Sequence, residues 1–230
     1  MPTPAEIASM AAALMNDAAQ NVYTNEKVLP YLNMTLDELQ ETFELNNVPV
    51  TNEESAIIPV PAGIDTIGFN TNPKLPQDLV EIQRVWERPA GVTPWNPMTR
   101  KEFIPRQYED QSITQFLWWA WRDQEIRVIP ATADNELKLD YVQDLFNTPI
   151  SINDVDVNLP IVNVKQYLGF QTAAFCAMYV AENETRAMAL EGKAQRALDR
   201  ELGIPTKGRQ AITTRRQPFM GSYRRRGYSV

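Results

Sequence analysis

The chain has 230 residues, of which 43% are hydrophobic, and its 22 basic and 29 acidic side chains give a formal net charge of −7. It contains no histidine and one cysteine, Cys176, which excludes an internal disulfide and any site built on histidine. No segment is long and apolar enough to cross a membrane, and the N-terminus lacks the features of a secretion signal, so we expect a soluble protein.

The first segment, residues 1–47, predicts an N-terminal helical hairpin. Pro4 opens the first helix, whose apolar positions recur at helical spacing as far as Val22. A turn leads to a second helical stretch, which we expect to break near Pro30. Thr35-x-x-Glu38 has the spacing of a capping box and would begin the last helical segment of the hairpin.

The second segment, residues 48–157, predicts a β-rich insert, because short runs of β-branched and aromatic residues alternate there with proline and glycine turns. Residues 79–88 are expected to form a turn of helix followed by a strand. The other expected strands are residues 56–60, 64–69, 112–121, 125–129 and 136–142.

Residues 116–121 within this insert do not alternate, and both faces of the expected strand are apolar and aromatic. Either the strand is covered on both sides within one subunit, or a neighbouring subunit buries one face. The candidate subunit interface consists of Phe116, Trp118, Trp119 and Trp121.

The third segment, residues 158–203, predicts one long C-terminal helix that packs with the hairpin in a helical bundle. Residues 164–202 contain no proline and carry an apolar stripe at helical spacing, and Gly203 and Pro205 follow as a stop signal. At about 1.5 Å per residue, such a helix could reach roughly 60 Å.

The last segment, residues 204–230, predicts an extended basic tail with seven basic and no acidic residues, while the rest of the chain has a net charge of −14. A tail opposite in charge to its own body, with aromatic residues among the arginines, indicates an interaction arm. A solvated terminus, a nucleic-acid-binding arm and a segment that docks on a protein partner are all compatible with this composition.

The sequence offers little for catalysis. It has no phosphate-binding glycine loop and no serine in a G-x-S-x-G turn. The closest carboxylate pairs, Asp134 with Glu136 and Asp154 with Asp156, lack the further oxygen ligands of a calcium loop. Cys176 lies among apolar residues and is interpreted as a small core or interface residue. We therefore expect a structural protein rather than an enzyme, with no cofactor and no metal.

The predicted fold class is α+β: a helical hairpin, a β-rich insert, a long helix and a basic tail. This layout resembles the head-to-tail adaptor (connector) proteins of tailed bacteriophages. The resemblance depends on the combined layout, on residues 171–174, on the alanine-rich residues 185–198, and on the end of the chain. There, Lys207-Gly208-Arg209-Gln210 is followed by Arg215-Arg216 and by the cluster at residues 224–226.

The resemblance implies a virion protein of the neck, made in the host cytoplasm. Family members form a homo-oligomeric ring, commonly a dodecamer, below the portal protein, and genomic DNA passes through the lumen without specific binding. The C-terminal arms would dock on the portal, and the β-rich parts would face a downstream neck or tail protein. The docking residues of this chain would be Lys207, Arg209, Arg215, Arg216, Phe219, Tyr223, Arg224, Arg225, Arg226 and Tyr228.

The alternative function is a nucleic-acid-binding module that uses the arginine-rich and aromatic C-terminal arm. Arginine side chains neutralise phosphates and aromatic rings stack on bases, so this composition would also suit RNA or DNA. The acidic body favours the adaptor, because an acidic surface around a DNA channel would not retain the DNA that passes through it.

Overall fold

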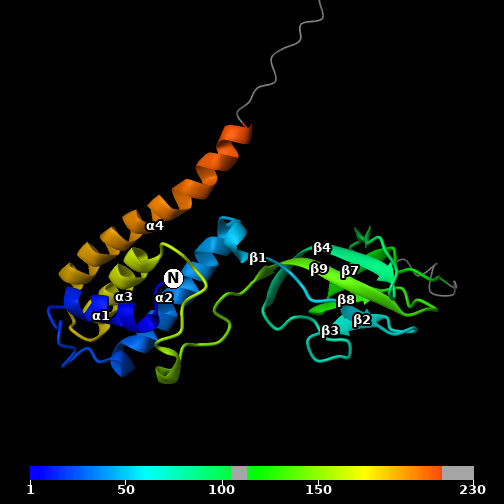
Figure 1. The fold of residues 1–230 in the computed structure, drawn as a ribbon. Coiled ribbons are helices and arrows are strands. Elements are labelled where there is room, and N and C mark those ends of the chain that lie inside the picture. Colours follow the sequence, from blue (N-terminus) through cyan, green and yellow to red (C-terminus); the bar gives the residue numbers. More distant parts are fainter. Residues whose placement is uncertain (105–112, 214–230) are drawn as a thin grey trace, which may run out of the picture. The chain divides into compact units, whose positions relative to one another are not determined.

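The computed structural model describes residues 1–104 and 113–213, with side chains as far as Gly203. These residues form four α-helices and two β-sheets, which confirms the α+β class (Figure 1). The chain divides into two compact units. One, the helical unit, combines residues 1–35 with residues 150 onward, and the other, the β-rich unit, consists of residues 36–149.

The helices are α1 (Pro4–Leu14), α2 (Asn25–Leu45), α3 (Lys165–Tyr179) and α4 (Glu184–Thr213), with short 3-10 turns at Pro49–Thr51 and Ile152–Asp154. The strands are β1 (Asn52–Glu54), β2 (Ile58–Val60), β3 (Thr66–Gly68), β4 (Leu79–Pro89), β5 (Asn96–Pro97), β6 (Thr99–Arg100), β7 (Trp118–Arg122), β8 (Glu125–Val128) and β9 (Asn135–Gln143).

The helical unit packs through small residues. Its core contains Ala8, Ala11 and Ala12 of α1 together with Ala173, Ala174 and Ala177 of α3, all of them buried. Gly169 of α3 faces Met10 of α1, and an added Cβ atom at residue 169 would lie 2.5 Å from the sulfur of Met10. A larger residue at this position would therefore require the Met10 side chain to move.

The prediction of one long helix over residues 158–203 is wrong, because the segment folds into two helices, α3 and α4, that pack against each other. Glu182 between them has a positive φ of 49°, and the side chain of Asn183 accepts the backbone N–H of Arg186 at 3.0 Å. Asn183 thus caps the start of α4. The segment has neither glycine nor proline at this turn, so its apolar periodicity continues across the break.

The predicted stop at Gly203 and Pro205 is also wrong, since α4 continues to Thr213. Gly203 is not among the glycines with positive φ, so it does not adopt the left-handed conformation that ends many helices. The expected extended tail is therefore helical over residues 204–213, and residues 214–230 lie outside the described part of the chain.

The first two helices also differ from the prediction. α1 ends at Leu14, because Asn16 has a φ of 63° and the carboxylate of Asp17 accepts the backbone N–H of residues 21–23, which organises a loop there. α2 continues through Pro30. Thr35 lies in the middle of this helix and donates its hydroxyl to the carbonyl of Tyr31 at 2.8 Å, so it does not form a capping box.

The β-rich unit contains the second half of α2 and two sheets that enclose one apolar core. β4 and β9 pair in antiparallel fashion along almost their whole length at the centre of the first sheet, whose order is β1-β9-β4-β5, with β2 also paired to β9. The second sheet has the order β3-β8-β7-β6. Val85 and Leu139 from the first sheet and Trp119 and Ile126 from the second belong to the same buried cluster.

The expected turn of helix near residue 79 is absent, since β4 is extended from Leu79 onward. The register of β4 against β9 shifts twice, between Leu79 and Glu81 and between Ile82 and Arg84. Each β-bulge adds one residue to the strand. Leu79, Ile82 and Val85 therefore all face the core at a three-residue spacing that resembles the period of a helix.

Glu87 of β4 connects the two sheets. Its side chain is buried, and its carboxylate accepts the backbone N–H of Phe116 at 2.6 Å and of Leu117 at 2.9 Å, just before β7. Burial raises the pKa of Glu87 above its usual range, although the two hydrogen bonds oppose this change.

We expect Gly169→Ala and Gly192→Ala to have different effects on stability. Both glycines lie within helices, so alanine should gain about 1 kcal/mol in helix propensity at each position. An added Cβ at Gly192 meets no atom within 4 Å, whereas at Gly169 it meets Met10. Urea unfolding followed by helical circular dichroism should show that Gly192→Ala raises the free energy of unfolding and that Gly169→Ala lowers it or leaves it unchanged.

A double variant provides the control for this comparison. Met10→Ala removes the atoms that the new Cβ would meet, so Gly169→Ala should be less destabilising in the Met10→Ala background than in the wild type. Equal stabilisation by the two glycine substitutions would contradict the close approach of α1 and α3.

The stability of the β-rich unit should depend on pH through Glu87. Because the folded state raises the pKa of this carboxyl, the folded protein binds its proton more tightly than the unfolded chain does. The contribution of Glu87 to stability is therefore fully present below the usual pKa of glutamate, and it is lost as pH rises through the folded value. Glu87→Gln removes the titration, so the unfolding free energy of the wild type relative to this variant should fall as pH rises from 4 to 7. A difference that stays constant or increases over this range would show that the folded environment does not raise the pKa.

Candidate functional site

The proposed docking tail lies mostly beyond what the structure describes. Lys207 and Arg209 belong to α4 by their backbone, and nothing further is described of their side chains. The remaining predicted docking residues, Arg215, Arg216, Phe219, Tyr223, Arg224, Arg225, Arg226 and Tyr228, lie outside the described residues.

The aromatic residues of the candidate subunit interface separate into two pairs. Phe116 and Trp119 are 0% and 2% exposed and belong to the core of their own unit, so they offer no surface to another subunit. Trp118 and Trp121 are half-buried in the same unit, and Trp121 packs against its core. Of the two alternatives for this segment, burial within one subunit therefore applies to Phe116 and Trp119, and an interface through Trp118 and Trp121 stays a prediction.

The backbone that leads into β7 is strained. Leu117 has a φ of 60°, and the N–H of Trp118 bonds to the carbonyl of Phe116 at 2.6 Å across it, which forms a tight turn that bulky residues rarely adopt. The Leu117 side chain is 45% exposed as a result. The buried Glu87 carboxylate holds both amides of this turn, so it positions the turn and the exposed leucine together.

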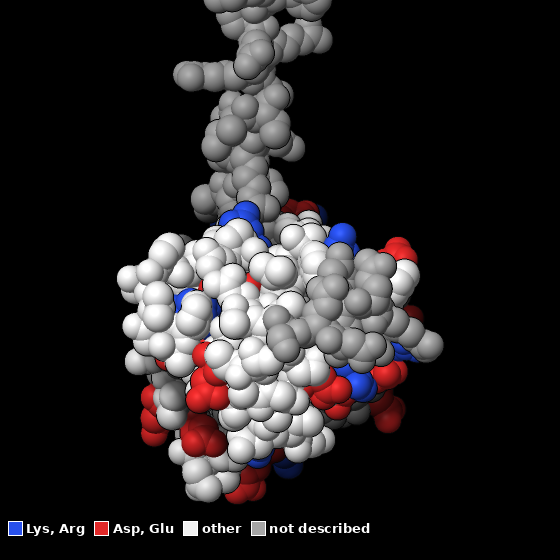
Figure 2. Space-filling view, turned by 90° about the vertical axis from the view of Figure 1, so that its right-hand side faces the viewer, with Lys and Arg blue, Asp and Glu red and all other residues white. Residues whose placement is uncertain are grey.

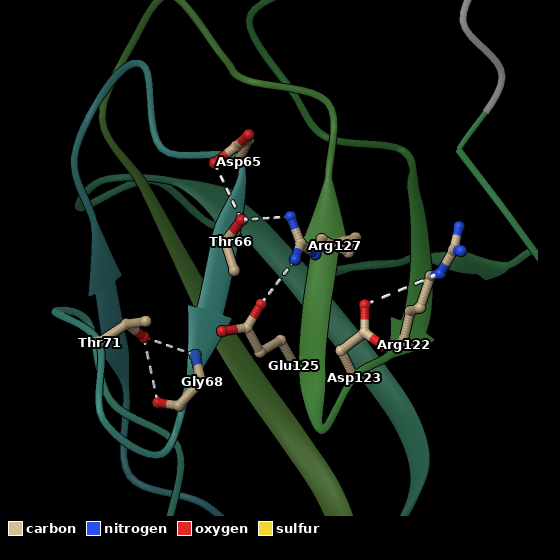
Figure 3. A network of polar contacts seen from close by, with 8 residues as sticks. All are labelled: Asp65, Thr66, Gly68, Thr71, Arg122, Asp123, Glu125 and Arg127. Carbon is tan, nitrogen blue, oxygen red and sulfur yellow. Dashed lines mark hydrogen bonds and ion pairs between the residues drawn. The ribbon is translucent and has the colours of Figure 1, made fainter.

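The outer face of the second sheet carries a network of paired polar side chains (Figure 3). Arg127 of β8 pairs with Glu125 at 2.9 Å and donates to the hydroxyl of Thr66 on β3, which in turn bonds to Asp65. Because Glu125 already neutralises Arg127, this arginine is a weak candidate for binding an anion. The neighbouring pair of Arg122 and Asp123, 3.8 Å apart, is largely exposed to solvent.

The outer face of the first sheet carries a second set of cross-strand pairs. Arg88 bonds to Glu136 at 2.6 Å and lies 4.3 Å from the ring centre of Trp95, and the indole N–H of Trp86 donates to Asp140 at 3.0 Å. These charged groups are mutually satisfied and leave the first sheet with a polar face.

The carboxylates singled out in the sequence lie apart from any metal-binding cluster. Among the side chains of residues 1–104 and 113–203, no group of three or more histidine, cysteine, aspartate or glutamate residues is placed to hold a metal ion. Asp134 accepts the backbone N–H of Ala62, Glu136 pairs with Arg88, and Asp154 accepts the hydroxyl of Ser151. Three of the four carboxylates singled out in the sequence therefore have structural partners.

Cys176 is buried in the helical core, as its apolar surroundings in the sequence predict. Burial raises the pKa of its thiol to about 12, so the reactive thiolate is scarce at neutral pH. Across the described helices, none combines the length and the hydropathy that a membrane-spanning segment requires.

Negative charge is concentrated in the β-rich unit. Residues 36–149 contain nine basic and nineteen acidic residues, a net charge of −10. On the face shown in Figure 2, uncharged residues fill most of the centre, and the acidic side chains lie mainly toward the edge. A net charge of this sign repels nucleic-acid backbones and attracts cationic groups.

Sequence reasoning missed several structurally important residues. In the sequence, Glu87 is one of many charged residues in an alternating run. Only the fold shows that its side chain is buried. Asn183 was recognisable in principle, since an asparagine followed by a glutamate is typical of the start of a helix. Gly169 carries no local signal, because its role depends on α1, more than 150 residues earlier in the chain.

Comparison with known proteins identifies the family. The model of the SU10 adaptor protein family matches residues 2–226, nearly the whole chain. No curated protein matches the sequence significantly. The match includes both units and most of the basic tail. The chain therefore belongs to the SU10 adaptor protein family, and it is a structural adaptor protein of a bacteriophage.

Proposed function

We propose that the chain is a head-to-tail adaptor that forms a homo-oligomeric ring, most simply a dodecamer, below the portal and connects the capsid to the tail or neck of the virion. The observation that carries this proposal is the family match over residues 2–226. The half-buried Trp118 and Trp121 are the candidate contact residues for neighbouring subunits in such a ring.

The charge distribution is compatible with a DNA channel. An adaptor ring encloses the path of the genome, and DNA must pass during packaging and ejection without being held. The net charge of −10 on residues 36–149 would repel the phosphate backbone wherever this unit lines the lumen. DNA is thus a passing partner rather than a specifically bound ligand.

The basic arm would attach the ring to the portal protein. Residues 207–230 combine seven basic residues with Phe219, Tyr223 and Tyr228 and contain no acidic residue. Arginine forks can pair in bidentate fashion with acidic portal residues, and the aromatic side chains can fill apolar pockets. The same composition supports the alternative, in which the arm binds nucleic acid, and the experiment below separates the two.

We expect deletion of residues 214–230 to abolish attachment to the portal without unfolding the protein. The deletion begins after the last described residue of α4, Thr213, and so removes none of the described helices or strands. Circular dichroism and urea unfolding should match the full chain. In a co-sedimentation assay, the truncated protein should fail to bind portal-bearing heads that lack tails.

Two further measurements complete this test. Replacing all five arginines of residues 214–230 by lysine keeps the charge but removes the bidentate geometry, so it should weaken attachment less than the deletion does. Attachment of the truncated chain with unchanged affinity would exclude the arm as the docking element. Loss of DNA binding at physiological salt, with attachment intact, would favour the nucleic-acid alternative.

A further inference from the structure

An exposed groove runs along one edge of the first sheet. β1 and β2 both pair with β9, and together with the residues between them they form the edge of this sheet. A loop from Asn72 to Asp78 forms the opposite wall, and Tyr141 and Gln143 of β9 line the groove between them. Its volume of about 700 Å³ is enough for several residues of an extended peptide.

The backbone of this edge has hydrogen-bonding groups directed into the groove. The N–H of Ser55 bonds to the carbonyl of Leu139 at 2.8 Å, so Ser55 directs its amide toward β9. Successive residues of an extended strand direct these groups to opposite sides. Glu54 and Ala56, on either side of Ser55, therefore direct their amides away from β9. The carbonyl of Glu54 points the same way, while the carbonyl of Ala56 accepts the hydroxyl of Ser55 at 2.8 Å.

Only part of the edge is suited to an added strand. Pro59 in β2 has no N–H and interrupts pairing there, as prolines on edge strands commonly do. The stretch that can accept a further strand is residues 52–57, which offers backbone hydrogen bonds over about 20 Å.

The chemistry of the groove favours a cationic and partly apolar peptide. Its charged lining residues are Glu53, Glu54 and Asp78 against Lys74, a net charge of −2, and the exposed Ile57 adds an apolar contact. Burial raises the pKa of Tyr141 to about 12, with Asp78 and Glu53 as further contributors, which is consistent with a negative potential in the groove. Glu54 forms an ion pair with Lys138, and the carboxylate of Asp78 accepts hydrogen bonds from Tyr141 and Gln143. Among the acidic residues of the groove, Glu53 is therefore the one that would pair with a cation of the bound peptide.

This chain itself contains a segment with the required chemistry. Residues 214–230, outside the described part, carry five arginines, three aromatic residues and no acid, and the last eight include Arg224, Arg225 and Arg226 between two tyrosines. At about 3.3 Å per residue, these seventeen residues can extend roughly 55 Å.

We propose that, before assembly on a portal, the groove at residues 52–57 binds the terminal segment, residues 223–230, of a second copy of this chain as an added β-strand. Backbone hydrogen bonds to the edge provide the strand geometry, and the arginines face the acidic lining. This proposal concerns the arm proposed above to dock on the portal. In the absence of the portal, the arm would bind the groove of another copy of the chain. The portal would then displace the arm from this groove.

The test is a peptide-binding measurement on the full chain. A fluorescein-labelled synthetic peptide of residues 214–230 is titrated with the protein, and its anisotropy is recorded at low and physiological salt. Glu53→Lys and Ile57→Lys should each weaken binding by about tenfold or more, and binding should weaken as salt increases. Hydrogen exchange should slow at the amides of Glu54 and Ala56, which face away from β9, when the peptide is present.

The controls match these changes in chemistry and exposure. Val92→Lys places the same side chain at a similarly exposed apolar position in the same unit, and Glu191→Lys reverses an exposed charge on α4. Both variants should bind the peptide normally. A peptide with Gly227→Pro keeps every charge but loses a strand amide, and it should bind more weakly than the natural sequence.

Three results would overturn the proposal: equal binding of the natural and proline-containing peptides, unchanged binding by both groove variants, or protection of amides elsewhere in the chain. The attachment of Glu53→Lys and Ile57→Lys proteins to portal-bearing heads is measured in parallel. Normal attachment together with lost peptide binding is the expected result. Because attachment to portal-bearing heads is measured separately, evidence against the adaptor function is distinguished from evidence against peptide binding in the groove.

Discussion

The antiparallel pairing of β4 with β9 is the interaction on which the β-rich unit depends. The two strands pair from Leu79 to Pro89, and their inner faces supply much of the buried cluster between the sheets. β9 also holds the edge strands β1 and β2, while β4 carries the Glu87 carboxylate that fixes the start of β7. The groove, the exposed turn at Leu117 and the polar outer face are all arranged around this pair.

The sequence predicts most of the β-rich unit because its strands follow local rules. Val85, Leu137 and Leu139 lie in alternating or bulged patterns that indicate one buried face, and the strands at residues 58–60, 66–68, 125–128 and 135–143 all fall within or close to predicted ranges. Where prediction fails, as at residues 79–82, two β-bulges have shifted the apolar spacing to a helix-like period. The error thus comes from a local irregularity that depends on the partner strand.

The helical unit is predicted less well because its decisive features are tertiary. The apolar stripe of residues 164–202 continues through the turn at residues 180–183, so periodicity alone does not separate α3 from α4. Burial of Val28, Leu29 and Leu32 stabilises α2 across Pro30. The candidate interface at residues 116–121 also depends on tertiary structure. The sequence shows two apolar faces, and only the fold shows that Phe116 and Trp119 are covered within their own unit.

This member of a phage adaptor family combines an acidic body with a basic terminal arm. Three of the four carboxylates considered for catalysis, Asp134, Glu136 and Asp154, have structural partners, and the single thiol is buried. The surfaces proposed above to contact other proteins are the arm, the half-buried tryptophans and the edge groove.

The central claim is that this chain forms a ring on the portal, and electron cryomicroscopy of the purified portal mixed with the full chain tests it most directly. We expect a reconstruction with a closed ring of this chain on the tail-facing end of the portal. Its copy number should be the same in every particle. Portal particles without added density, or with isolated single subunits, would contradict the proposed adaptor function.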